Sequence, residues 1–194
     1  MFFYFLYTFL YVRKGEDAME TSCQSYCLQC AAGREEGVAR QIRQATGLVA
    51  LAPKLVRLEW KGSTAARKEQ VLFPGYVFLY AHDMELNKVS GVHHMQRILA
   101  YGSGQRQLYG RDAEVASWIL AYEGVIRESR AYRVGERIVV VEGPMKDLGG
   151  VIKSVNKQRR RANVEFTFEG IARSVWMAFD WVVPKESDGC YALG

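Results

Sequence analysis

The strongest candidate for chemistry in this sequence is a cluster of cations near the C-terminus. Lys157, Arg159, Arg160 and Arg161 fall within five positions, and Lys153 lies just upstream. Cations concentrated in one turn suit the phosphate backbone of a nucleic acid, and Arg adds bidentate contacts to phosphate or to guanine edges. The alternative is a solvated surface turn. The residue types therefore predict RNA binding at this turn, and the alternative of a solvated surface turn stays open.

A second candidate is the segment Phe73-Pro74-Gly75-Tyr76, which interrupts an apolar stretch from Val71 to Tyr80. A Pro-Gly pair in a strand bends the backbone. The bend can leave two aromatic side chains at a surface where a partner helix buries them. The alternative is that both aromatics belong to the core.

Metal binding and catalysis are not expected. Cys23, Cys27 and Cys30 suggest a zinc knuckle, but residues 26–30 alternate as a strand does, which sends Cys27 and Cys30 to opposite faces. His93 and His94 are adjacent and cannot easily share one ion. We find no nucleophile elbow, phosphate-binding glycine loop or pair of catalytic carboxylates. The sequence predicts a non-enzymatic protein without a metal or cofactor.

Composition places the chain among globular proteins. It has 194 residues, 49% of them hydrophobic, 24% charged, and a net charge of +5. We expect a cytoplasmic, monomeric protein of two domains. The apolar run at residues 1–12 is too short to span a membrane and lacks the features of a signal peptide. Lys14-Gly15-Glu16 can be encoded by a sequence resembling a ribosome-binding site, so Met19 is the expected start and residues 1–22 are expected to be a disordered or untranslated leader.

The elements expected in a first domain, residues 23–127, mix strands and helices. The helix at 33–46 has acidic residues in its first turn and ends at Gly47, and Asp112 is expected to cap the second helix. Residues 61–70 are polar and are expected to form an exposed hairpin loop. The expected strands are 26–30, 48–60 interrupted by Pro53, 71–80 and 96–100.

After an expected linker at 128–132, the pattern changes to short strands with glycine-bearing turns. Strands are expected at 137–142, 151–155, 162–168 and 174–183. Such a series predicts a small SH3-like barrel over residues 133–186, followed by a tail at 187–194. The fold class is therefore α+β.

Two motifs in this order resemble the NusG family of transcription elongation factors. Residues 133–144, followed by Asp147, Gly149-Gly150 and Val151, are similar to a KOW motif. Residues 26–29 before a glycine and a helix, together with residues 73–77, are similar to the family's N-terminal domain. The resemblance implies an RRM-like open sheet with flanking helices, followed by the KOW barrel.

The resemblance also implies partners. In this family the first domain docks on the clamp helices of the largest RNA polymerase subunit through an apolar pocket. Tyr26, Phe73, Pro74, Gly75 and Tyr76 match the positions of that pocket. His93, His94 and Arg97 lie where the family approaches the non-template DNA strand. The implied function is antitermination, in which the bound factor promotes read-through of terminators.

Within the family, residues 152–162 resemble the specialised LoaP antiterminators, in which the barrel recognises a leader RNA hairpin. That resemblance assigns RNA binding to Lys153, Lys157, Arg159, Arg160 and Arg161. Glu169 precedes Gly170 where housekeeping members have an apolar residue that contacts a ribosomal protein, so we do not expect coupling to the ribosome. Two alternatives stay open: a general elongation factor without an RNA target, and a translation-associated KOW protein that binds ribosomal RNA.

Overall fold

The computed structural model describes residues 23–61, 64–135 and 137–183, so the expected leader at 1–22 and the tail at 187–194 lie outside the described residues. The N-terminal part comprises β1 (Gln24–Cys30), α1 (Glu35–Thr46), β2 (Val49–Leu51), β3 (Lys54–Lys61), β4 (Thr64–Val71), β5 (Tyr76–Ala81), the 3-10 helix η2 (Asp83–Val89), β6 (Met95–Ile98), α2 (Gly110–Ala121) and β7 (Val125–Ile126). The barrel comprises β8 (Ser129–Val134), β9 (Arg137–Glu142), α3 (Pro144–Asp147), β10 (Val151–Asn156), β11 (Arg161–Phe168) and β12 (Ile171–Trp181). This mixed α and β arrangement confirms the predicted fold class.

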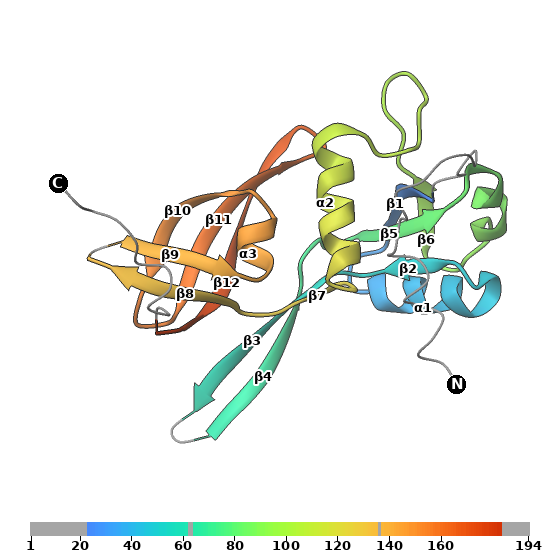
Figure 1. The fold of residues 1–194 in the computed structure, drawn as a ribbon. Helices are drawn as coiled ribbons and strands as arrows, with labels where there is room; N and C mark the ends of the chain where they lie inside the picture. The colour runs from blue at the N-terminus through green and yellow to red at the C-terminus, as the bar shows by residue number, and fades with distance from the viewer. Residues whose placement is uncertain (1–22, 62–63, 136, 184–194) are drawn as a thin grey trace, which may run out of the picture.

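Strand β1 lies inside the N-terminal sheet, whose described strands run in the order β2-β5-β1-β6. Tyr26 and Leu28 pack on the side of α1, whereas Cys27 packs on the opposite side. Both sides are covered, because α1 lies against one and the α2 layer against the other (Figure 1). The alternation was predicted correctly, but β1 is buried on both faces rather than half-buried.

Helix α1 follows the sequence pattern closely. Val38, Ala39 and Ile42 are buried against the sheet, and Gly47 ends the helix with φ +73°, a conformation that glycine adopts without a side-chain clash. Helix α2 differs in its start. Tyr109 holds the capping position, and Asp112 lies inside the first turn, where it is buried, so the prediction of Asp112 as the cap is wrong.

The stretch expected as a loop at 61–70 is instead strand β4. It pairs with β3 in continuous antiparallel register from Lys54↔Val71 to Lys61↔Thr64, and the hairpin projects from the body of the molecule (Figure 1). Ala66, Arg67, Lys68, Glu69 and Gln70 are all exposed. Exposed side chains at 66–70 give no apolar alternation, which explains the wrong prediction.

Strands β8 to β12 form the curled barrel sheet, in the order β10-β11-β12-β8-β9 among the described residues. Strand β8 pairs in parallel with β12 through Ser129↔Phe179 and Ala131↔Trp181. Ser129 and Ala131 are both fully buried. Residues 129–132 of the expected linker therefore belong to the barrel, which corrects that prediction, and Arg127 and Glu128 connect the two parts.

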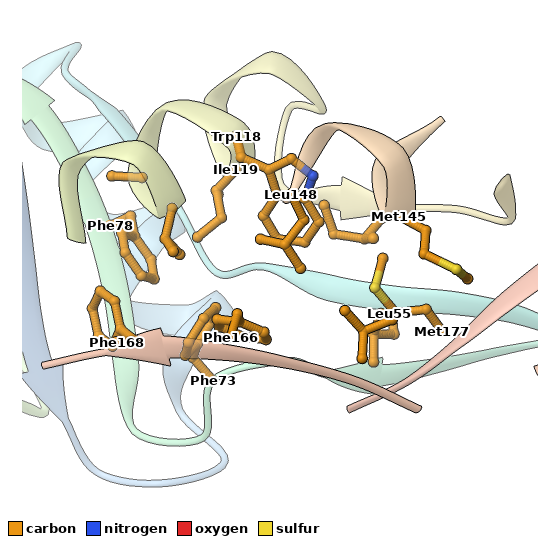
Figure 2. Packing of buried hydrophobic residues seen from close by; sticks show 14 of the residues in the cluster. Leu55, Phe73, Phe78, Trp118, Ile119, Met145, Leu148, Phe166, Phe168 and Met177 are labelled. Atoms are coloured by element: carbon orange, nitrogen blue, oxygen red, sulfur yellow. The ribbon is translucent and has the colours of Figure 1, made fainter. Parts of the chain in front are cut away.

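One hydrophobic core joins the barrel to the N-terminal part. Figure 2 shows Phe73, Phe78 and Trp118 from the N-terminal part beside Phe166, Phe168 and Met177 from the barrel. Helix α2 stands between the two parts and packs on β11 (Figure 1). The barrel is therefore docked on the N-terminal part through apolar side chains.

Candidate functional site

The turn between β4 and β5 presents the aromatic residues singled out in the sequence. Gly75 adopts φ +82°, and a Cβ there would lie 3.4 Å from the carbonyl oxygen of Cys30. The backbone N–H groups of Gly75 and Gly33 donate to Glu35 Oε1 at 2.7 and 2.9 Å. Glu35 thus fixes the turn from below, although it is buried like a core residue.

These hydrogen bonds decide the protonation state of Glu35. Burial on its own raises the pKa of a carboxyl group, because it disfavours the charged form. Here the donations from the backbone N–H groups of Gly75, Glu35 and Gly33 outweigh burial and lower the pKa of Glu35 below its usual value. The carboxylate is therefore charged at neutral pH and anchors the turn.

Phe73 inserts into an aromatic cluster that spans both parts of the molecule. Its ring centroid lies 5.3 Å from Phe78, 5.9 Å from Phe166 and 5.1 Å from Phe168. Tyr76 contacts Phe168 edge-on at 6.2 Å. Phe73 and Phe168 are fully buried, so the barrel covers the aromatic face of this turn.

Arg173 of β12 completes this cluster on the barrel side. Its guanidinium carbon lies 5.9 Å from the ring centroid of Phe73, 5.6 Å from that of Tyr76 and 5.9 Å from that of Phe168. A cation over an aromatic face is attracted by the electron density of the ring. Arg173 also faces Glu169 at 3.7 Å. We call Phe73, Tyr76, Phe166, Phe168 and Arg173 the aromatic interface.

Polar contacts surround the aromatic interface. Asp112 accepts from the hydroxyl of Tyr101 at 2.7 Å and from the backbone N–H of Glu169 at 2.8 Å. Trp118 Nε1 donates to the carbonyl of Pro144 at 2.9 Å, and Tyr122 donates to Asp147. The hydrogen bond to Asp147 adds to burial in raising the pKa of Tyr122 to about 12.

The docking residues predicted from the sequence do not all lie on one surface. Phe73 and Tyr76 lie together with the Pro74-Gly75 turn between them, and Pro74 is exposed. Tyr26 instead lies on the α1 side of the sheet, fully buried, and its hydroxyl donates to Gln24. The prediction that Tyr26 shares their surface is wrong, because the alternation of β1 directs it to the opposite face.

The basic turn, residues 157–160 with the flanking Lys153 and Arg161, is exposed but not free of acidic neighbours. Lys153 pairs with Glu165 at 2.9 Å and Arg160 with Asp180 at 2.6 Å. Arg161 lies 3.7 Å from Glu59 of the β3–β4 hairpin. The backbone N–H of Arg159 donates to Asn156; Arg159 is exposed, and Lys157 is half-buried. Any anion that binds here competes with these carboxylates.

His93, His94 and Arg97 form a separate exposed group around β6, the edge strand of the N-terminal sheet. The two imidazole centroids are 3.9 Å apart, and Arg97 Nε donates to Gln29 at 2.8 Å. Local desolvation and the nearby His93 and Arg34 lower the pKa of His94. In Figure 1, β6 lies in the half of the molecule opposite the barrel.

Cys27 and Cys30 are packed as core residues, whereas Cys23 is exposed. Cys27 and Cys30 are buried in the two different hydrophobic clusters, on opposite sides of β1. Burial raises the pKa of Cys27 strongly and that of Cys30 to about 11, so both stay protonated. Within the described ranges, no three His, Cys, Asp or Glu side chains gather as metal ligands would. The helices in those ranges include none with the length and apolarity needed to cross a membrane.

Comparison with known proteins bears on the N-terminal part first. Residues 24–117 match the family described as "Transcription termination factor nusG". The matched region holds Glu35, Phe73, Pro74, Gly75 and Tyr76, so the turn fixed by Glu35 lies within the part of the chain that is similar to this family.

The similarity continues into the barrel. "Transcription termination/antitermination protein NusG" of Buchnera aphidicola is 27% identical over 172 residues, and that of Escherichia coli K12 is 26% identical. Each alignment covers 81% of this chain and 93% of the relative. A solved structure described as "Domain interaction in Thermotoga maritima NusG" covers 80% of this chain and 93% of that chain, with 22% identity and a TM-score of 0.48. The chain is therefore similar to these NusG proteins over most of its length.

Several residues of the site were missed in the sequence. Three of them make contacts between the N-terminal part and the barrel, which are distant along the chain: Asp112, Phe168 and Arg173. The alternation of β11 does place Phe166 and Phe168 on the inner face, but nothing local indicates that the inner face ends against Phe73. Glu35 had a weaker signal, since it was assigned only to the first turn of a helix.

Proposed function

We propose that this protein is a transcription antitermination factor that docks on RNA polymerase through Phe73 and Tyr76 and recognises a leader RNA hairpin with its barrel. By holding the clamp helices of the largest subunit, it suppresses pausing and promotes read-through of terminators. The supporting relatives are named for termination and antitermination.

The aromatic interface is the observation that carries the docking proposal. Phe73 and Tyr76 already bind another structural unit, because they pack on Phe168 and lie under Arg173. Two aromatic side chains on a turn fixed by Glu35 suit an apolar helical partner. Since the barrel occupies this surface, polymerase must displace the barrel to dock.

The basic turn supports the RNA part of the proposal. Arg159 and Arg160 are exposed, and the neighbouring residues of the turn add further positive charge. Phosphate contacts by such cations release counterions, and cations gathered in one turn suit the phosphate backbone of a duplex or hairpin. His93, His94 and Arg97 are the proposed contacts to the non-template DNA strand, on a face that the barrel leaves open.

Capture of RNA polymerase by the full chain tests the docking proposal. Phe168→Glu places a charge in the aromatic interface and should release the barrel, which raises capture of purified polymerase well above that by the unchanged protein. Adding Tyr76→Ala to this variant should remove the gain, because the exposed anchor is lost. Val134→Ala, at an exposed position of the barrel outside the interface, is the matched control.

Two results would contradict this function. If Phe168→Glu opens the interface but captures no polymerase, the aromatic surface is not the docking surface. If the same variant captures ribosomal proteins or ribosomal RNA instead, the protein acts in translation. Phe168 is buried and Glu169 stands before Gly170, so the aromatic side chain at this tip of the barrel is covered in this arrangement, and only Ile171 beside it is an exposed apolar residue of the described tip.

A further inference from the structure

The β3–β4 hairpin meets the barrel beside the basic turn, and the contact is centred on one carboxylate. Glu59 Oε1 lies 3.1 Å from Arg57 Nε and 3.7 Å from Arg161 Nη2, while Glu59 Oε2 lies 3.4 Å from Lys68 Nζ. One anion is thus shared by three cations from two parts of the molecule. The group keeps two net positive charges, which leaves it attractive to a further anion.

The register of the hairpin places these cations on one face. Arg57 and Lys68 are directly opposite each other in the β3–β4 pair, so their side chains emerge on the same side. The Lys68 side chain is 56% exposed, whereas those of Arg57 and Arg161 are 17% and 22% exposed. Lys68 is therefore open to solvent, whereas the guanidinium groups of Arg57 and Arg161 are more enclosed.

The barrel continues this face with an exposed indole. Arg161, Asn163 and Glu165 alternate with buried residues along β11, so they share the outer side of the sheet. Asn163 is opposite Trp176 of β12, and Arg161 is opposite Ala178. Trp176 is 42% exposed, which is unusual for so large an apolar side chain. Its partner Asn163 is two residues from Arg161 on the same face of β11, so Trp176 and Arg161 are diagonal neighbours.

We propose that the β3–β4 hairpin and the outer face of β11 and β12 form one RNA-binding surface, in which Arg57, Lys68 and Arg161 hold stem phosphates and Trp176 stacks on an unpaired base. This inference rests on the proposed RNA binding by the barrel and extends it to the N-terminal part. In the free protein the carboxylate of Glu59 pairs with the cations that would otherwise bind phosphate.

The combination of groups favours RNA with both paired and unpaired nucleotides. Cations alone would serve a duplex or an acidic peptide equally well. An exposed indole adds affinity only where a base is unstacked, and folded RNA presents such bases in loops and bulges. The amide of Asn163 and the hydroxyl of Ser174, which hydrogen-bond to each other beside Trp176, can exchange that bond for base edges.

Binding of synthetic RNA to the full chain, followed by fluorescence anisotropy at several salt concentrations, tests the surface. The probes are a hairpin with unpaired purines in its loop and a fully paired duplex with the same stem. Trp176→Leu should weaken hairpin binding about tenfold and leave duplex binding nearly unchanged. Trp176→Tyr should restore most of the loss, because it keeps an aromatic face.

The hairpin cations give the second measurement. Lys68→Gln should weaken both probes a few-fold and reduce the slope of log affinity against log salt by about one. Glu59→Gln should strengthen both probes a few-fold, since the cations lose their internal competitor. Lys88→Gln, an exposed lysine of η2 paired with Glu85, is the matched control and should change neither probe.

The outcomes separate this inference from the proposed function. If Trp176→Leu, Lys68→Gln and Glu59→Gln all bind as the unchanged protein does while Arg159→Ala loses affinity, the composite surface is overturned and RNA binding by the turn stands. If the unchanged protein binds neither probe at low salt, both ideas fail. If Trp176→Leu weakens duplex and hairpin equally, the indole does not stack on a base and its assigned role is wrong.

Discussion

The two ends of β11 join the barrel to the N-terminal part in opposite ways. At Phe168 the contact is aromatic, buried and closed by Arg173, whereas at Arg161 it is a long ion pair of 3.7 Å between partly exposed side chains. Charge screening by salt does not weaken apolar burial, but it weakens partly exposed ion pairs, which contribute little. The aromatic end therefore fixes the position of the barrel, and the charged end can exchange partners at little cost.

The difference in stability between the two ends is the largest expected effect. Phe168→Ala should lower the free energy of unfolding by about 3–5 kcal/mol, because it removes a buried ring and leaves a cavity. Arg161→Gln should lower it by less than about 1 kcal/mol. Urea denaturation followed by circular dichroism measures both. Equal losses would mean that the ion pair contributes as much to stability as the aromatic cluster, which would contradict the comparison.

The basic turn should show its effect in salt dependence rather than in stability. Changing Arg159, Arg160 and Arg161 together to Ala should flatten the slope of log RNA affinity against log salt by roughly two to three units, if most of them touch phosphate. Arg159→Ala alone should account for about one unit, since its side chain is exposed. The control is polymerase capture by the Phe168→Glu background, which the triple change should leave intact. Unchanged affinity and slope would reduce the turn to a solvated surface.

The stability of the protein at low pH tests how Glu35 holds the Pro74-Gly75 turn. The pKa of Glu35 is lowered in the folded protein, so its contribution is present above the pKa of the unfolded chain and is lost as pH falls through the lowered folded value. Glu35→Gln should cost about 1–2 kcal/mol at neutral pH, because hydrogen bonds to a charged acceptor are replaced by weaker ones. Its penalty should shrink toward pH 3. A penalty that is constant with pH would show that the charge of Glu35 is not what holds Gly75.

A further expected effect on stability concerns Arg173. Replacing it with Met keeps much of the apolar stem but removes the charge over the rings of Phe73 and Tyr76. The cost should be about 0.5–2 kcal/mol in the free energy of unfolding, as for partly desolvated cation–π contacts. The same urea measurement, with Arg130→Met at an exposed ion pair of β8 as control, separates this contact from a general charge effect.

Local patterns were enough for most elements of the fold. The helix from Glu35, its end at Gly47 and the strands of the barrel follow from apolar spacing and glycine positions. The β4 strand could not be found this way, because its residues 66–70 are all exposed and show no apolar alternation. The linker prediction failed at Ser129 because its polar side chain is buried for a specific reason: its hydroxyl accepts from the backbone N–H of Met145 at 2.8 Å.

The site was predictable only in part. Phe73 and Tyr76 were identified because a Pro-Gly turn between aromatics is an unusual local feature. What covers them depends on Phe168, nearly a hundred residues later, and no periodicity reports such an approach. Tyr26 was assigned to the same surface by resemblance, although strand alternation already separates it from Cys27, which faces the aromatic side.

The two-residue connection between β7 and β8 has a consequence for competition. Ile126 is paired to Leu55 and Ser129 to Phe179, so Arg127 and Glu128 form the whole tether between the N-terminal part and the barrel. A tether this short keeps a released barrel at a high effective concentration, on the order of millimolar, around the surface it left. Under the proposed function, polymerase would therefore compete with an intramolecular rival whose concentration does not fall on dilution. A second ligand that holds the barrel away, such as bound RNA, would lower that local concentration and favour docking.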